Sequence, residues 1–168
     1  MNQDVKSVLL SEEELANIVK DLGRRISEDY KDKNLMMIGV LKGSFIFIAD
    51  LMRAVDIPCR VDFMAVSSYG SGVRTTGEVR IVKDLDKTVS GYDLLVVEDI
   101  LDSGMTLSYL LENLQSRKPD SVRLCTLLDK DVYKRQGQHR AGGVCGQSHP
   151  RVGDDQDPRA GCSFPPAV

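Results

Sequence analysis

The stretch from Val96 to Thr106, VVEDILDSGMT, combines the side-chain types that a sugar phosphate requires. A buried strand ends in two adjacent carboxylates, Glu98 and Asp99, and a loop of small and hydroxyl residues then opens a helix. Backbone N–H groups at a helix N-terminus favour an anion, and carboxylates suit sugar hydroxyls or a shared Mg²⁺ ion. Asp102 lies at the edge of the loop, within reach of whatever is attached to the sugar. The stretch therefore predicts a ribose 5-phosphate site.

An ordinary strand–loop–helix turn is the alternative for the same residues. In that interpretation Asp102 or Ser103 only caps the helix that follows. The two acids placed directly before the loop, at the end of a buried strand, favour the phosphate site over the cap.

The pattern of apolar residues predicts the elements that must hold this loop. A capping box of Ser11 and Glu14 begins a first helix, a second is expected at 45–54, and spaced leucines from Leu107 to Leu114 indicate a third. Strands are expected at 35–41, 59–66, 79–82, 93–99 and 122–128. Strands that alternate with helices predict an α/β fold with a parallel sheet flanked by helices. Ligands of such sheets bind beyond the carboxyl ends of the strands.

Composition limits the classes of function. The 168 residues are 42% hydrophobic and 28% charged with a net charge of −3, as expected for one globular domain. Residues 1–130 carry 17 Lys and Arg against 21 Asp and Glu, which argues against a nucleic-acid partner. Apolar runs are shorter than the roughly 20 residues that cross a bilayer, so no membrane partner is expected. Cysteines in apolar runs, without CxxC spacing, predict a reduced, cytoplasmic protein.

Three segments resemble one enzyme family. Val96 to Thr106 closely resembles the signature by which type I phosphoribosyltransferases bind phosphoribosyl pyrophosphate (PRPP). Leu41-Lys42-Gly43-Ser44 resembles the pyrophosphate loop of the family, in which the Leu–Lys peptide is typically cis. Asp62 to Gly70 resembles the strand and the start of the mobile lid in hypoxanthine phosphoribosyltransferases. The resemblance covers about residues 8–130 and is nearest to the bacterial hypoxanthine–guanine branch.

The resemblance implies a reaction and a role for each residue. The enzyme would transfer the phosphoribosyl group from PRPP to hypoxanthine or guanine, releasing IMP or GMP and pyrophosphate, with Mg²⁺ as cofactor. Asp102 would be the general base facing the purine. Glu98 and Asp99 would hold the ribose hydroxyls, directly or through Mg²⁺. The remaining substrate contacts would come from the pyrophosphate loop, the lid and the phosphate loop: Leu41, Lys42, Gly43, Ser68, Tyr69, Ser103, Gly104, Met105 and Thr106. The family also implies a homo-oligomer, a dimer or a tetramer.

Residues 131–168 depart from this pattern. They hold six of the 14 glycines and four of the six prolines and show no periodicity. We therefore predict a phosphoribosyltransferase domain at 1–130 that lacks its C-terminal strand and hood, followed by an unstructured tail at 131–168. Frameshifted or artefactual sequence is one interpretation of this tail, and a divergent natural tail is the other. Low activity of the chain as written is expected.

Two other functions remain open at this point. A non-catalytic PRPP-binding regulatory protein on the same fold would keep the phosphate loop. A salvage enzyme for another base would keep everything before residue 131, because the segment that reads the purine lies later in the family pattern. Ser68, Tyr69 and Asp102 favour the enzyme over the regulator.

Overall fold

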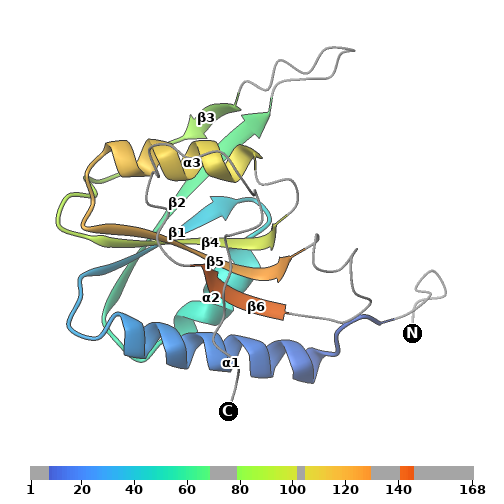
Figure 1. Cartoon of the computed structure of the whole chain (residues 1–168). Coiled ribbons are helices and arrows are strands. Elements are labelled where there is room, and N and C mark those ends of the chain that lie inside the picture. The colour runs from blue at the N-terminus through green and yellow to red at the C-terminus, as the bar shows by residue number, and fades with distance from the viewer. Residues whose placement is uncertain (1–7, 69–78, 102–104, 130–140, 146–168) are drawn as a thin grey trace, which may run out of the picture.

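The computed structural model describes residues 8–68, 79–101, 105–129 and 141–145 of the chain. In chain order the elements are α1 (Glu12–Asp29), β1 (Leu35–Leu41), α2 (Phe45–Ala54), β2 (Cys59–Ser68), β3 (Val79–Lys83), β4 (Asp93–Leu101), α3 (Met105–Ser116), β5 (Ser121–Asp129) and β6 (Ala141–Cys145). The strands form one sheet in the order β3-β2-β1-β4-β5-β6 (Figure 1).

The sheet is parallel at its centre and antiparallel at both edges. β1 pairs in parallel with β2 on one side and with β4 on the other, and β5 extends the parallel part. β3 and β6 pair antiparallel with β2 and β5. The chain leaves β1 toward β2 and later returns on the other side of β1 with β4, so the winding direction reverses between β1 and β4. In α/β proteins, ligands bind outside the carboxyl ends of the two strands at such a reversal, and this place is hereafter called the crevice.

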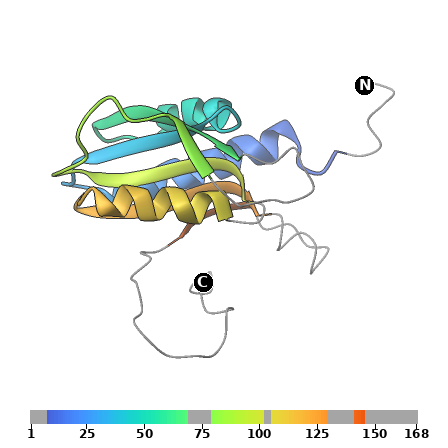
Figure 2. The same ribbon diagram turned by 90° about the horizontal axis from the view of Figure 1, so that it is seen from above.

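Strand alternation divides the core between the two faces of the sheet. In β1, Leu35 and Met37 join a buried cluster with α1 and α2, whereas Met36 and Ile38 join a second cluster with α3. Successive side chains of a strand point to opposite faces, so a continuous apolar run such as 35–41 fills both cores. α3 therefore covers one face of the sheet, and α1 and α2 cover the other (Figures 1 and 2).

The N-terminal helix begins where its capping box predicts. The Ser11 hydroxyl accepts a hydrogen bond from the Glu14 N–H at 3.2 Å, and the Glu14 carboxylate accepts one from the Ser11 N–H at 2.7 Å. α1 packs closely on α2 at Gly23, where an added Cβ would lie 2.5 Å from the carbonyl oxygen of Ala54. Within the described residues, no helix combines the length and the apolar composition that a bilayer crossing requires.

The predicted fold class is confirmed: the sheet is mostly parallel and helices flank both faces. Two of the expected strands, β2 and β4, each continue two residues further than predicted, to Ser68 and to Leu101. Glu98 and Asp99 therefore lie inside a paired strand and not at its last residues, because β5 continues to pair with β4 as far as Leu101 opposite Asp129.

One expectation about the C-terminal segment is wrong. A sixth strand, β6, forms at Ala141–Cys145 and pairs with β5 from Leu124 opposite Cys145 to Leu128 opposite Ala141. Its sequence AGGVC has no apolar alternation, yet β5 offers a row of unpaired N–H and C=O groups that any backbone in register can satisfy. Glycine weakens a strand without preventing its hydrogen bonds. The rest of 131–168 lies outside the described residues.

Candidate active site

The acidic pair lies near the carboxyl end of β4, two residues before its last residue Leu101. Pairing between these two strands runs from Leu35 opposite Asp93 to Gly39 opposite Val97. Glu98 and Asp99 follow Val97 directly, so on the β1 side no strand pairing continues beside them. The crevice at the winding reversal therefore carries the two carboxylates that the sequence singled out.

The loop after β1 comes to this crevice. The Leu41–Lys42 peptide is cis, as the resemblance to the pyrophosphate loop predicts. A Cβ added to Gly43 would lie 2.7 Å from Asp99 Oδ1 and 2.9 Å from Oδ2, closer than real Cβ contacts. Glycine is thus the residue that lets the backbone approach the carboxylate. Lys42 and Gly43 are brought to Asp99 although more than fifty residues separate them in the sequence.

Ser44 is a positioning residue that the sequence analysis did not assign to the site. It is fully buried, and its hydroxyl donates a hydrogen bond of 2.7 Å to the carbonyl oxygen of Val40. Its N–H points to the same carbonyl at 3.3 Å, and its own carbonyl accepts from Ile48 N–H in the first turn of α2. Ser44 therefore fastens the loop to both flanking elements. The serine directly after Lys42-Gly43 was the signal that the sequence offered.

The two carboxylates point to opposite faces of the sheet. Glu98 and Asp99 are neighbours within β4, and successive side chains of a strand point to opposite faces. Burial, and then the neighbouring charge of Asp99, raise the pKa of Glu98 to about 7. Its Oε2 atom is buried and has no hydrogen-bond partner among the described residues. A buried polar atom without a partner needs an explanation, and a bound ion or ligand group is one that its chemistry allows.

The raised pKa of Glu98 predicts how stability depends on pH. Between pH 4.5 and 7 the unfolded chain loses this proton while the folded chain keeps it, so stability falls as pH rises, and the full cost is present above pH 7. After a discount for partial solvent screening, the cost is about 1–2 kcal/mol. Relative to wild type, Glu98→Gln should therefore gain about that much stability between pH 4.5 and pH 8.

Urea unfolding without divalent cations measures this difference. Glu112→Gln, which changes an exposed glutamate of α3, is the matched control. A stability difference between wild type and Glu98→Gln that stays constant from pH 4.5 to pH 8 would contradict the assignment.

The remaining site residues are placed in part. α3 begins at Met105, directly after the expected phosphate loop, and Thr106 lies half-buried in its first turn. Ser68 is the last residue of β2. Tyr69 and the segment 102–104, which includes the expected base Asp102, lie outside the described residues.

The donor set suits a magnesium ion that keeps other ligands. Mg²⁺ prefers oxygen donors and is usually held by one or two carboxylates together with water and substrate phosphates. Asp99 presents both oxygens beside the Gly43 backbone, and Glu98 has an unpartnered oxygen. Across the described residues no cluster of three or more His, Cys, Asp or Glu side chains is placed to hold a metal ion. The oxygen donors of Asp99 and Glu98 therefore fit a metal ion that substrate also ligates.

Known proteins resemble this chain in sequence and in fold. The family model for the phosphoribosyl transferase domain matches residues 7–143. The hypoxanthine-guanine phosphoribosyltransferase of Staphylococcus epidermidis is 52% identical over 130 residues, 77% of this chain and 73% of the relative. Its counterpart in Bacillus subtilis is 50% identical over 130 residues, 77% and 72% of the two chains. A crystal structure of a hypoxanthine phosphoribosyltransferase from Staphylococcus aureus superposes with a TM-score of 0.73 at 46% identity, covering 82% of this chain and 74% of that one.

These similarities confirm the resemblance seen in the sequence. They extend over the reversal crevice and both loops that border it, and the family model reaches past residue 130 into β6. On the strength of its fold, its crevice and these matches, the chain belongs to the phosphoribosyltransferase family.

Proposed function

We propose that this chain is a purine-salvage enzyme that transfers the 5-phosphoribosyl group from PRPP to hypoxanthine or guanine, giving IMP or GMP and pyrophosphate. The observation that carries the proposal is the contact of the Lys42–Gly43 loop with Asp99 at the crevice between β1 and β4. The loop offers a backbone and a lysine that suit an anion, and Asp99 offers a carboxylate that suits a sugar. In PRPP, an anionic pyrophosphate and a sugar lie on either side of the bond that breaks.

Each group of residues has a distinct task in the proposed reaction. Lys42 and Gly43, with Leu41, bind the pyrophosphate that leaves C1 of the ribose. Ser103, Gly104, Met105 and Thr106 bind the 5-phosphate at the start of α3, where the helix dipole favours an anion. Ser68 and Tyr69 close the site and exclude water, which would otherwise hydrolyse the activated sugar.

Asp102 is proposed as the general base. Its carboxylate accepts or shares the proton on purine N7 while N9 attacks C1 of the ribose and pyrophosphate departs. Because positive charge develops on the sugar at that moment, negative carboxylates near the ribose stabilise the transition state. Asp99 supplies such charge, and Glu98 adds to it when its carboxyl is ionised, above its raised pKa of about 7.

Mg²⁺ is the proposed cofactor, with Asp99 and Glu98 as the protein groups that would hold it, directly or through the ribose hydroxyls. When bound, the ion supplies positive charge that neutralises and orients the leaving pyrophosphate.

The activity is tested by mixing the full chain with PRPP, Mg²⁺ and hypoxanthine and measuring IMP and pyrophosphate. Both products are expected in equal amounts, EDTA is expected to stop their formation, and guanine is expected to give GMP. Asp120→Asn, an exposed carboxylate outside the crevice, is the control for preparation quality. PRPP binding without any product would contradict the enzyme and support a non-catalytic PRPP-binding regulator.

The cellular setting and assembly are proposals of the same kind. A cytoplasmic location is supported by Cys59 and Cys125, which are free among the described residues. A homodimer or homotetramer is supported by exposed Phe45 and Ile46 in the first turn of α2. For residues 131–168 outside β6, the lack of regular structure remains a prediction.

A further inference from the structure

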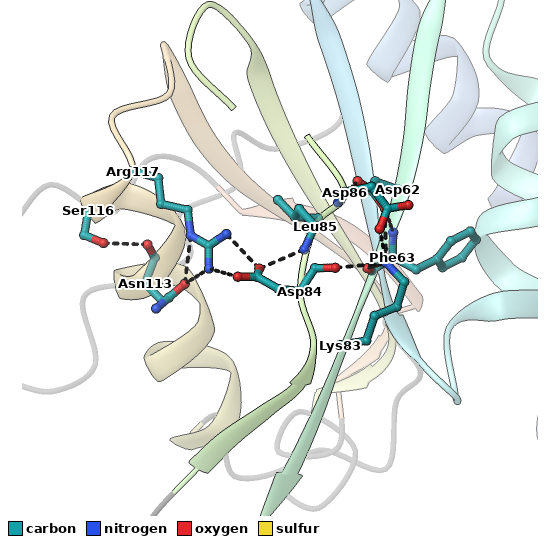
Figure 3. A network of polar contacts seen from close by, with 9 residues as sticks. All are labelled: Asp62, Phe63, Lys83, Asp84, Leu85, Asp86, Asn113, Ser116 and Arg117. Carbon is teal, nitrogen blue, oxygen red and sulfur yellow. Dashed lines mark hydrogen bonds and ion pairs between the residues drawn. The ribbon is translucent and has the colours of Figure 1, made fainter. Parts of the chain in front are cut away.

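A polar network joins the β2–β3 hairpin to the far end of α3. Figure 3 shows it as a continuous set of contacts that begins at Asp62 in β2 and passes through Lys83 at the end of β3 and residues 84–86. It ends on Asn113 in α3 and on Arg117, the residue that follows α3. Among these residues, only Asp62 belongs to a segment whose function the sequence predicted.

The network is linked to α3 by a bidentate ion pair between Arg117 and Asp84. Arg117 Nη1 donates to Asp84 Oδ1 at 2.7 Å, and Nη2 donates to Oδ2 at 3.0 Å. Both partners are oriented in advance. Asn113 Oδ1 accepts from Arg117 Nε at 3.1 Å and from Nη2 at 2.7 Å, while Asp84 Oδ1 accepts the N–H of Leu85 at 2.8 Å. The hydrogen bond from Arg117 is the main reason that the pKa of Asp84 lies below its ordinary value.

The link to β2 is made by Lys83 and Asp62. Lys83 Nζ donates to the carbonyl oxygens of Phe63 and Asp84, each at 2.9 Å, and to Asp86 at 3.2 Å. The Asp62 carboxylate accepts the N–H of Asp86 at 2.9 Å and lies 3.5 Å from Lys83 Nζ. Residues 83–86 are therefore held on one side by β2 and on the other by α3.

Both elements run from this joint to the substrate end of the sheet. From Asp62 to Ser68, β2 spans about 20 Å at the usual rise of a strand. From Arg117 back to Met105, α3 spans about 18 Å at the usual rise of a helix. α3 is packed through Leu107, Leu110 and Leu114 into the same buried cluster that Ile81 and Leu85 border. A change at the joint is therefore carried along two stiff elements to their opposite ends.

We propose that the Asp84–Arg117 pair is a positioning pair, which fixes the substrate end of the β2–β3 hairpin relative to the start of α3 and thereby sets the affinity for PRPP. This inference rests on the proposed function, because the hairpin and the start of α3 are the elements assigned there to the lid and the 5-phosphate. The two residues touch no reacting atom. A half-exposed ion pair by itself contributes little to folding stability, so its effect on affinity is separable from its effect on the fold.

Arg117→Lys is the principal variant because lysine keeps the positive charge but cannot make the bidentate hydrogen bonds of the guanidinium group. In the full chain, the dissociation constant and the KM for PRPP with Mg²⁺ should rise about two- to fivefold, the most that a half-exposed ion pair can supply, while kcat and the thermal midpoint stay unchanged. Asp84→Asn should behave alike, and the double variant should be no worse than either single variant, because both remove the same interaction. Arg24→Lys, which loses a similar exposed pairing with Asp21 and Glu28 on α1, is the matched control and should match wild type.

Hydrogen–deuterium exchange supplies a readout that needs no ligand. Amides of β3 and of the first turn of α3 should exchange faster in Arg117→Lys and not in Arg24→Lys. An unchanged PRPP affinity in Arg117→Lys, or a lowered thermal midpoint with unchanged KM, overturns the positioning role.

The wild-type titration separates this inference from the proposed function. A wild-type chain that binds no PRPP overturns the proposed function and the role in affinity together. The exchange data then decide whether the joint itself holds the two elements: faster exchange supports the joint, and unchanged exchange overturns it.

Discussion

Asp102→Asn is expected to lower kcat for IMP formation by about 10²–10⁴-fold, the usual cost of losing a general base. The amide keeps the shape of the side chain but cannot accept the purine N7 proton. The dissociation constant for PRPP should change by less than about threefold, because the carboxylate acts on the base and not on the sugar phosphate. Steady-state kinetics with hypoxanthine and calorimetric titration with PRPP and Mg²⁺ measure the two quantities.

Asp120→Asn is the matched control for this substitution, since it changes an exposed carboxylate in the turn between α3 and β5. It should leave both quantities at the wild-type level. If Asp102→Asn changes kcat by less than about threefold, Asp102 is a helix cap and the catalytic assignment is wrong.

Gly43→Ala should lower kcat/KM for PRPP by about 10²-fold, the loss expected from a displacement of about 1 Å at a reacting centre. The added methyl group would lie 2.7 Å from Asp99 Oδ1, so either the loop or the carboxylate must move. Movement of either one separates the group proposed to hold pyrophosphate from the group proposed to hold the ribose. The dissociation constant for pyrophosphate with Mg²⁺, measured by calorimetry, should rise as well.

Gly23→Ala provides a control with a similar clash and no connection to the crevice. Its Cβ would lie 2.5 Å from the carbonyl oxygen of Ala54, between α1 and α2. The thermal midpoint of this variant should fall, while kcat/KM per folded molecule stays near wild type. Wild-type kcat/KM in Gly43→Ala would show that the loop tolerates a side chain and that its closeness to Asp99 is not required.

Much of the fold follows from local sequence. The continuous apolar run from Leu35 to Leu41 predicted a strand buried on both faces, and its residues fill both cores. The capping box at Ser11 and Glu14 marked the start of α1, because its hydrogen bonds join residues only three apart. Such patterns predict structure from the sequence because the interactions that stabilise them join residues close together in the chain.

The strand β6 could not be predicted in this way. Its residues carry no apolar alternation, and its place depends on the free edge of β5, which exists only after the parallel sheet has formed. A backbone that pairs through N–H and C=O groups leaves no signature in its side chains.

The sequence by itself determined the chemical groups of the site and the protein family. The signals were the acids Glu98 and Asp99 and the loop at Lys42 and Gly43 that interrupts an apolar run. Only the tertiary structure decided that Gly43 lies against Asp99, that the two carboxylates point to opposite faces of the sheet, and that Arg117 holds Asp84 across 33 residues. These relations depend on the strand order β2-β1-β4, which places segments distant in the chain side by side. The order in turn arises from how both sheet faces are covered by helices, a property of the whole domain that no local pattern encodes.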